Sequence, residues 1–151
     1  MAHCPHPPAY TEIFPSSTPA EMLVNGFRNG QQLRVVGILD KKHMERHKRF
    51  EVNFHGPQDH AFHFNARFDE KSIVMNNTRG GKWQTEQRCV YPFVADEIFT
   101  LDFVSMHGVI QISLNGKPLA DFAERNCPTS INRIEVKGDT RIHCIRVTIP
   151  Q

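Results

Sequence analysis

The sequence predicts an all-β sandwich, and three observations favour this fold class. The chain has 151 residues and a formal net charge of +2, which suits one globular domain with a core of its own. From about Leu33 onward, short segments rich in β-branched and aromatic residues show a period of two. Gly, Asn, Asp and Pro residues separate these segments about every ten residues. The segments are too many for one flat sheet, so a sandwich is expected.

Ten segments have this strand pattern. In chain order they are Leu33–Leu39, Phe50–Phe54, His60–Phe68, Ser72–Asn76, Gln84–Val90, Ile98–Ser105, Val109–Leu114, Ala120–Phe122, Arg133–Lys137 and Ile142–Ile149. Turns are expected where Gly or Asn can take a positive φ, at Gly80-Gly81, His107-Gly108, Asn115-Gly116 and Gly138-Asp139. The one stretch with helical character is Asp40–Arg49, and a helix of that length is marginal in isolation.

The chain divides into a short leader and one domain. Residues 1–19 hold half of the prolines and form the leader, and residues 20–151 form the domain. The opening residues lack the basic and apolar parts of a signal peptide, and no apolar run reaches the ~20 residues that span a bilayer. We therefore expect synthesis in the cytosol, no insertion into membranes and reduced cysteines. The cysteines are Cys4, Cys89, Cys127 and Cys144.

The most informative segment is the expected strand His60–Phe68. Successive side chains of a strand point to opposite faces, so its apolar and polar side chains separate. The apolar row, which should pack into the core, is Phe62, Phe64, Ala66 and Phe68. The polar row is His63, Asn65 and Arg67. This row forms a fixed array of hydrogen-bond donors and acceptors on an exposed surface, which indicates recognition of a ligand.

The next segments extend the polar surface. Asn76 alternates with Met75, so Asn76 can face the polar side while Met75 faces the core. Trp83 follows the turn at Gly80-Gly81 and is expected to be exposed.

Glu86 is expected to complete the array. If the three segments are neighbouring antiparallel strands, Glu86 can lie between Arg67 and Arg88 and accept charge-assisted hydrogen bonds from both. Such an array beside an exposed Trp suits a neutral ligand rich in hydroxyl groups. Galactose fits best, because its axial 4-hydroxyl leaves one ring face as a continuous C–H patch that can stack on the Trp.

Three motifs together resemble those of the galectins, which are β-galactoside-binding lectins. The motifs are His63-Phe-Asn65-Ala-Arg67, Val74-Met-Asn76 and Trp83-Gln-Thr-Glu86-Gln-Arg88. The likeness extends over roughly residues 20–149. It implies a jelly-roll sandwich of two antiparallel sheets, with the sugar on the concave sheet.

The resemblance also implies a role for each of seven side chains. His63, Asn65 and Arg67 would bind the galactose 4-hydroxyl, Asn76 and Glu86 the 6-hydroxyl, and Trp83 would stack under the ring. Arg67 and Glu86 would also reach the 3-hydroxyl of the adjoining glucose or N-acetylglucosamine, with Arg88 supporting Glu86.

The partners that the resemblance implies are β-galactoside-containing glycans and glycoproteins, bound without a metal or a cofactor. It further implies a cytoplasmic and an extracellular location, reached by secretion without a signal peptide. A homodimer, the first domain of a tandem pair and a monomer all remain open. The alternative function is a galectin-like domain with altered or lost galactose binding, which acts as a protein-interaction or acidic-glycan-binding module.

Two other functional classes are not expected. A glycosidase needs two carboxylates, one of them with a raised pKa. Glu86 between two arginines should stay ionised, and Asp69 is the one candidate for its partner, so no enzyme is expected. The basic run Lys41–Arg49 suits a solvated loop, with acidic glycans or nucleic acid as the alternatives. We expect no nucleic acid partner, and no zinc at His43 and His47 because a third ligand is not evident.

Overall fold

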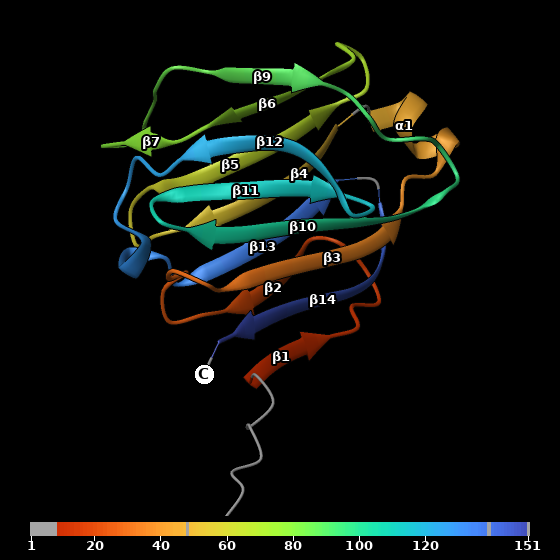
Figure 1. Ribbon diagram of the computed structural model, residues 1–151. Helices are drawn as coiled ribbons and strands as arrows, with labels where there is room; N and C mark the ends of the chain where they lie inside the picture. The colour runs from red at the N-terminus through yellow and green to blue at the C-terminus, as the bar shows by residue number, and fades with distance from the viewer. Residues whose placement is uncertain (1–8, 48, 139, 151) are drawn as a thin grey trace, which may run out of the picture.

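The computed structural model describes residues 9–47, 49–138 and 140–150. Its strands form two six-stranded sheets, with antiparallel pairing throughout, and a separate two-stranded hairpin. The two large sheets lie face to face, as Figure 1 shows. The predicted all-β sandwich is therefore confirmed.

We name each large sheet after a central strand. The β10 sheet, in front in Figure 1, has the order β1 (Ala9–Ile13), β14 (Arg141–Ile149), β3 (Gln32–Ile38), β10 (Ile98–Met106), β11 (Val109–Leu114) and β12 (Lys117–Ala123). The β5 sheet behind it has the order β2 (Ala20–Leu23), β13 (Arg133–Gly138), β4 (Arg49–His55), β5 (His60–Arg67), β6 (Ser72–Asn76) and β9 (Gln87–Val90). The hairpin is β7 (Thr78–Arg79) with β8 (Lys82–Trp83), and a short 3-10 helix spans Pro128–Ser130.

The core lies between the sheets and is rich in phenylalanine. Phe54 is fully buried, and its ring centroid lies 4.9 Å from that of Phe27 and 5.4 Å from that of Phe103. On β5, Phe62 and Phe64 are at most 1% exposed and face this core. The predicted apolar face of β5 is thereby confirmed.

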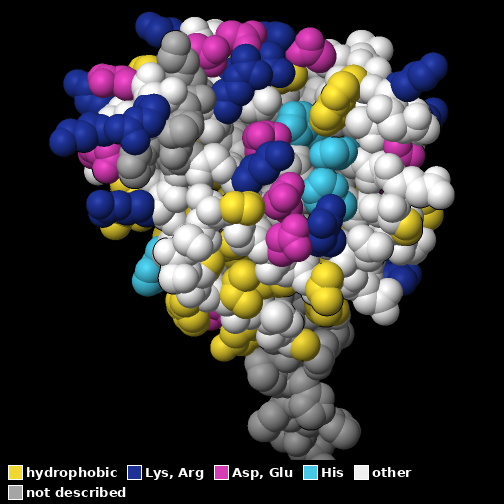
Figure 2. All heavy atoms as spheres, turned by 180° about the vertical axis from the view of Figure 1, so that it is seen from behind, with side chains coloured by type: hydrophobic (Ala, Val, Ile, Leu, Met, Phe, Trp, Pro, Cys, Tyr) yellow, Lys and Arg dark blue, Asp and Glu magenta, His cyan; other side chains and the backbone are white. Residues whose placement is uncertain are grey.

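The outer face of the β5 sheet is polar. It is turned away from the viewer in Figure 1 and toward the viewer in Figure 2, where a row of histidines lies among acidic and basic side chains. The period of two along β5 thus separates an apolar inner face from a polar outer one, as the sequence predicts. The expected exposure of the polar row is wrong for His63 and Asn65, which are only 7% and 5% exposed.

All ten predicted strands exist, and the bounds of β6 and β11 agree with the prediction. The predicted strand Gln84–Val90 is shorter, because β9 begins only at Gln87. The sequence pattern did not reveal β1, β2, β7 or β8, which have at most five residues each. In the turns at Gly80-Gly81, His107-Gly108 and Asn115-Gly116 both residues have a positive φ, as expected for hairpins.

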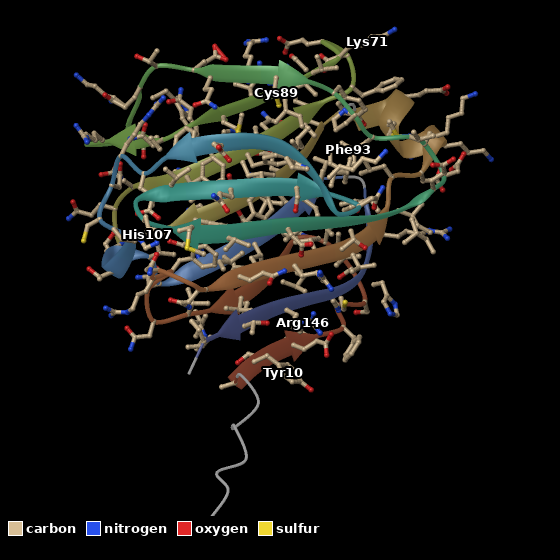
Figure 3. All side chains as sticks on the ribbon, viewed as in Figure 1. Tyr10, Lys71, Cys89, Phe93, His107 and Arg146 are labelled. Carbon is tan, nitrogen blue, oxygen red and sulfur yellow. The ribbon has the colours of Figure 1, made fainter. Side chains whose placement is uncertain are left out.

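Part of the predicted leader is an edge strand of the β10 sheet. Residues 9–13 form β1 and pair with β14, where Ala9 lies opposite Ile149. The guanidinium group of Arg146 on β14 lies 5.9 Å from the ring centroid of Tyr10 on β1, and Figure 3 labels both residues. The prolines of the leader hid this strand, because proline is depleted in strands.

The predicted helical stretch forms the short helix α1 (Lys41–His47). The side chain of Asp40 caps it by accepting a hydrogen bond from the backbone N–H of Lys42 at 2.9 Å. Met44 is 5% exposed and anchors the helix to the core. The side chains of His43 and His47 lie outside the described part of the chain.

The described residues include three of the four cysteines. Cys89, Cys127 and Cys144 are free thiols, and Cys4 lies outside the described residues. Within the described ranges, no helix is both long enough and apolar enough to cross a bilayer.

We predict that Phe54→Ala lowers the free energy of unfolding by about 3–5 kcal/mol, because it leaves a cavity between the sheets that the surrounding aromatic rings cannot fill. Urea denaturation at equilibrium measures this loss. The matched control is Phe14→Ala, since Phe14 is 67% exposed and its removal should change stability little. Equal losses for the two variants would contradict the assignment of the core.

Candidate functional site

A groove of about 460 Å³ crosses the polar outer face of the β5 sheet. Its lining comes from β4, β5, β6 and the segment that follows β7. The lining residues are Arg49, Glu51, His63, Asn65, Arg67, Val74, Asn76, Trp83, Gln84 and Glu86. Six of the seven predicted site residues therefore line one groove, and the seventh, Arg88, contacts the groove through Glu86.

The β7–β8 hairpin holds Trp83 over one end of the groove. The turn residues Gly80 and Gly81 have φ values of 57° and 75°, which glycine adopts without strain. Their backbone N–H groups donate to the carboxylate of Asp59 at 3.2 and 2.9 Å. Trp83 is 52% exposed, and its ring centroid lies 4.7 Å from that of His63. The hairpin thus presents an aromatic face beside the polar row.

His63 is held in one tautomer by the residues behind it. Its Nδ1 lies 2.5 Å from Oδ1 of Asn53, whose Nδ2 donates to Glu135 at 3.1 Å. Because Oδ1 of Asn53 is therefore the acceptor, Nδ1 of His63 carries the proton, and Nε2 of the neutral ring has a free lone pair.

Burial keeps this imidazole neutral. It lowers the pKa of His63 to about 3, and the nearby His60 and Arg67 add to the shift. At neutral pH, Nε2 is consequently a hydrogen-bond acceptor. The sequence predicted the position of His63 but not its charge state.

Asn65 and Arg67 leave polar atoms unpaired at the floor of the groove. Asn65 is 5% exposed, and its buried Oδ1 has no hydrogen-bond partner among the described residues. The buried Nε of Arg67 also has no partner there. An unpaired buried polar group costs about 1–3 kcal/mol, so these two atoms favour a ligand that hydrogen-bonds to both.

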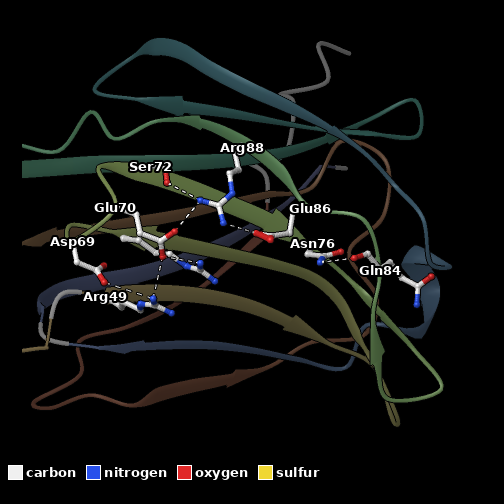
Figure 4. Close-up of polar contacts among 9 residues, drawn as sticks. Arg49, Asp69, Glu70, Ser72, Asn76, Gln84, Glu86 and Arg88 are labelled. Carbon is white, nitrogen blue, oxygen red and sulfur yellow. Dashed lines mark hydrogen bonds and ion pairs between the residues drawn. The ribbon is translucent and has the colours of Figure 1, made fainter.

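Glu70 joins the arginines of the site, and the sequence analysis missed it. Its carboxylate accepts hydrogen bonds from Arg67 at 2.8 Å, Arg88 at 2.9 Å and Arg49 at 3.1 Å (Figure 4). These hydrogen bonds, those from Arg88 and Arg67 above all, lower the pKa of Glu70. The available signal was its position three residues after Arg67, in the turn between β5 and β6.

The expected bridge of Glu86 between two arginines is wrong. Glu86 accepts a hydrogen bond from Arg88 at 2.9 Å, but the described contacts include none between Glu86 and Arg67. The reason is the strand register: β6 lies between β5 and β9, and Val90, not Glu86, is in line with Ser72 and Arg67. Glu70 makes the bridge instead, and Glu86 remains at the rim of the groove.

Asn76 faces the groove with most of its amide engaged. Its Nδ2 donates to the backbone oxygen of Gln84 at 3.0 Å, and its Oδ1 accepts from the backbone N–H of Asn77 at 2.8 Å. One amide hydrogen remains for a ligand. The predicted alternation is confirmed, since Met75 is fully buried in the core.

The arrangement supports hydrogen bonding and stacking. It combines an aromatic face, a neutral acceptor, an amide and fixed guanidinium groups. Among the residues that the structure describes, no group of three or more His, Cys, Asp or Glu side chains is arranged to hold a metal ion.

Sequence comparisons identify related proteins. The family model of the galactoside-binding lectins matches residues 19–147. A 32 kDa beta-galactoside-binding lectin of Caenorhabditis elegans is 34% identical over 127 residues, which are 83% of this chain and 44% of that protein. Galectin-4 of Homo sapiens is 32% identical over 154 residues, covering 96% of this chain and 46% of that protein. The chain thus spans less than half the length of these relatives.

Solved structures agree with this result. The galectin LEC-6 of Caenorhabditis elegans superposes with a TM-score of 0.84 and is 42% identical, covering 90% of this chain and 94% of that one. Sheep galectin-11 has a TM-score of 0.79 at 23% identity, and covers 87% of this chain and 98% of its own. The latter likeness shows the fold alone.

We predict that His63 makes the folded protein less stable in acid. The unfolded chain takes up a proton at this side chain near pH 6.5 and the folded chain near pH 3, so the free energy of unfolding falls as the pH drops through this window. In His63→Gln this contribution is absent. The stability difference between wild type and variant should therefore change by up to about 1.4 kcal/mol per pH unit.

Urea denaturation at several pH values between 3.5 and 7, in about equal steps, measures this difference. His107→Gln is the control, because His107 is exposed and lies outside the groove, and it should follow the wild type. Parallel stability profiles for wild type and His63→Gln would show that His63 titrates normally in the folded protein.

Proposed function

Because the chain belongs to the galactoside-binding lectin family, we propose that it is a lectin that binds β-galactosides of the lactose and N-acetyllactosamine type. The groove of the β5 sheet is the proposed site. The observation that carries the proposal is the neutral His63 beside the unpaired atoms of Asn65 and Arg67, next to the exposed ring of Trp83.

The floor of the groove suits an axial hydroxyl. A hydroxyl donates one hydrogen bond and accepts up to two. Above this floor it can accept from Nε of Arg67 and donate its one proton to either of two acceptors, the unpaired Oδ1 of Asn65 or Nε2 of the neutral His63. The 4-hydroxyl of galactose projects from the ring in this way, whereas the equatorial 4-hydroxyl of glucose does not.

Trp83 would hold the opposite side of the sugar. With its 4-hydroxyl axial, galactose has one face of C–H groups, which can stack on an aromatic ring. Asn76 and Glu86 lie farther along the groove and supply a donor and an acceptor for the 6-hydroxyl. The next sugar of the disaccharide would contact Arg67 and Glu86, with Arg88 holding Glu86 in place.

Glu70 preorganises the proposed site. Three guanidinium groups converge on its carboxylate, so Arg67 and Arg88 are fixed before a ligand arrives. Fixing these flexible side chains in advance reduces the entropy that binding would otherwise lose.

A single site of this kind binds weakly. A few hydrogen bonds worth about 0.5–1.5 kcal/mol net each, less the cost of ordering, correspond to micromolar to millimolar affinity. Cross-linking of glycoconjugates would therefore require two sites held together, by a homodimer or by a second linked domain. Such glycans are displayed outside the cell, so the proposed ligand supports an extracellular site of action.

We further infer that the groove has no hydrolytic activity. Both candidate carboxylates, Glu86 and Asp69, lie beside arginine: Glu86 accepts a hydrogen bond from Arg88 at 2.9 Å, and Asp69 lies 3.6 Å from Arg49, so neither is placed to donate a proton to a leaving group.

We predict that Trp83→Ala abolishes measurable binding of lactose, because the variant loses the aromatic face under the sugar. Isothermal titration with lactose measures this, with sucrose and maltose as sugars that should not bind to the wild type. Tyr10→Ala is the matched control, since Tyr10 is also an exposed aromatic residue but lies on β1 of the other sheet. Lactose binding that survives Trp83→Ala would refute the assigned stacking platform.

We also predict that the protein does not release a chromogen from a nitrophenyl β-galactoside. Absorbance is followed during prolonged incubation, with Glu86→Gln measured in parallel. The catalytic alternative would gain support from turnover in the wild type that Glu86→Gln removes.

A further inference from the structure

The amide of Asn76 has a defined orientation, although asparagine amides rotate easily. Nδ2 donates to the backbone oxygen of Gln84, and Oδ1 accepts from the backbone N–H of Asn77 and from Nη1 of Arg125 at 3.2 Å. With two donors on Oδ1, the free hydrogen of Nδ2 points to the groove, so Asn76 is a donor for a bound ligand.

Arg125 approaches the groove from the side of the β10 sheet. It follows the edge strand β12, and its guanidinium group lies 4.7 Å from the ring centroid of Phe122. Phe122 is fully buried and stacks on Phe62 of β5, with ring centroids 4.5 Å apart. The guanidinium group of Arg125 thus lies against the aromatic core and at the same time reaches Asn76 at the end of the groove.

One nitrogen of Arg125 joins three parts of the site. Besides Asn76, Nη1 contacts Oδ1 of Asn77 at 3.0 Å and the backbone oxygen of Thr85 at 2.6 Å. Thr85 lies in the loop between Trp83 and Glu86. A single charged donor therefore holds both the end of β6 and the loop that carries the other ligand contacts.

Further bonds fix the backbone of this segment. The backbone oxygen of Arg125 accepts from Nη2 of Arg79 at 2.6 Å, which ties it to β7. Asn126, the next residue, accepts from Nδ2 of Asn77 at 2.8 Å and donates to the backbone oxygen of Thr78 at 3.1 Å. Arg125 is therefore held from the hairpin side as well as from the core.

We propose that Arg125 is a positioning residue for the galactose 6-hydroxyl, acting through the amide of Asn76 and the loop at Thr85. This inference rests on the proposed function. Without Arg125, the Asn76 amide loses one of the two donors that fix its orientation, and the loop that carries Glu86 loses a charged anchor. The 6-hydroxyl would then lose its fixed donor and acceptor, while contacts to the 4-hydroxyl on β5 stay intact.

The test compares lactose with 6′-deoxylactose, which lacks the galactose 6-hydroxyl, by isothermal titration. For the wild type we expect lactose to bind about tenfold more tightly, since one or two hydrogen bonds differ. For Arg125→Met, whose side chain can still pack on Phe122, we expect the ratio of the dissociation constants for 6′-deoxylactose and lactose to fall to about one. The affinity for 6′-deoxylactose itself should change little. A purely structural role would weaken the two ligands equally and leave the ratio unchanged.

Two further variants make the test specific. Arg146→Met is the matched control, because Arg146 also lies over an aromatic ring but belongs to β14, and its ratio should equal that of the wild type. In an Asn76→Ala background, Arg125→Met should weaken lactose binding less than it does in the wild type, since part of its effect passes through Asn76. Thermal denaturation checks folding, and Arg125→Leu, which also lacks a donor, replaces Arg125→Met if the latter does not fold.

The outcomes separate this inference from the proposed function. Absence of lactose binding in the wild type would overturn the proposed function. Lactose binding in the wild type, together with an unchanged ratio in folded Arg125→Met or Arg125→Leu, would overturn the role of Arg125 alone.

Discussion

The period of two along β5 is the constraint on which the rest of the structure depends. The same eight-residue strand supplies Phe62 and Phe64 to the core and His63 and Asn65 to the groove. A shift of its register by one residue would exchange the two faces, burying the polar row between the sheets and exposing the aromatic one. The binding surface therefore cannot be altered without cost to the core, because each polar residue is flanked in the chain by residues that stabilise the sandwich.

Two arrangements of side chains, around His63 and around Glu70, order the groove before a ligand arrives. The first removes charge, and the second retains it. Around His63, burial removes charge, and a chain of hydrogen bonds through Asn53 to Glu135 selects the tautomer. Around Glu70, charge is retained but paired, since one carboxylate lies among three guanidinium groups. One end of the groove is thus a neutral acceptor in an aromatic setting, and the other is a charged network at the surface. A neutral ligand with many hydroxyl groups suits this combination, because it can donate at one end and accept at the other.

Much of the fold and of the groove could be predicted from the sequence, because strand periodicity fixes which side chains share a face. All ten expected strands rest on that local rule, and so do the places of His63, Asn65, Arg67 and Asn76 on the outer face. The bridging role of Glu86 was wrong because it depends on a register between strands that the sequence does not give: β6 separates β9 from β5, and Val90 rather than Glu86 is in line with Arg67. Glu70 was missed because its place depends on a turn in which Lys71 has a φ of 50°, which no period reveals. β1 escaped notice for another reason, since it lies among the prolines of the leader and its exposed residues show no alternating pattern.

The pairing of β1 with β14 determines how the protein responds to force. Ala9 lies opposite Ile149, so tension applied through the two ends of the described chain acts across the hydrogen bonds of this pair and not along the strands. The load falls on one rung of the ladder at a time, and β1 peels away at low force in the manner of a zipper. Once β1 has peeled away, the load at the N-terminal end reaches β2, the edge strand of the β5 sheet, while β13 still separates β2 from the strands that line the groove. A molecule stretched between two attachment points would therefore lengthen before its groove is disturbed.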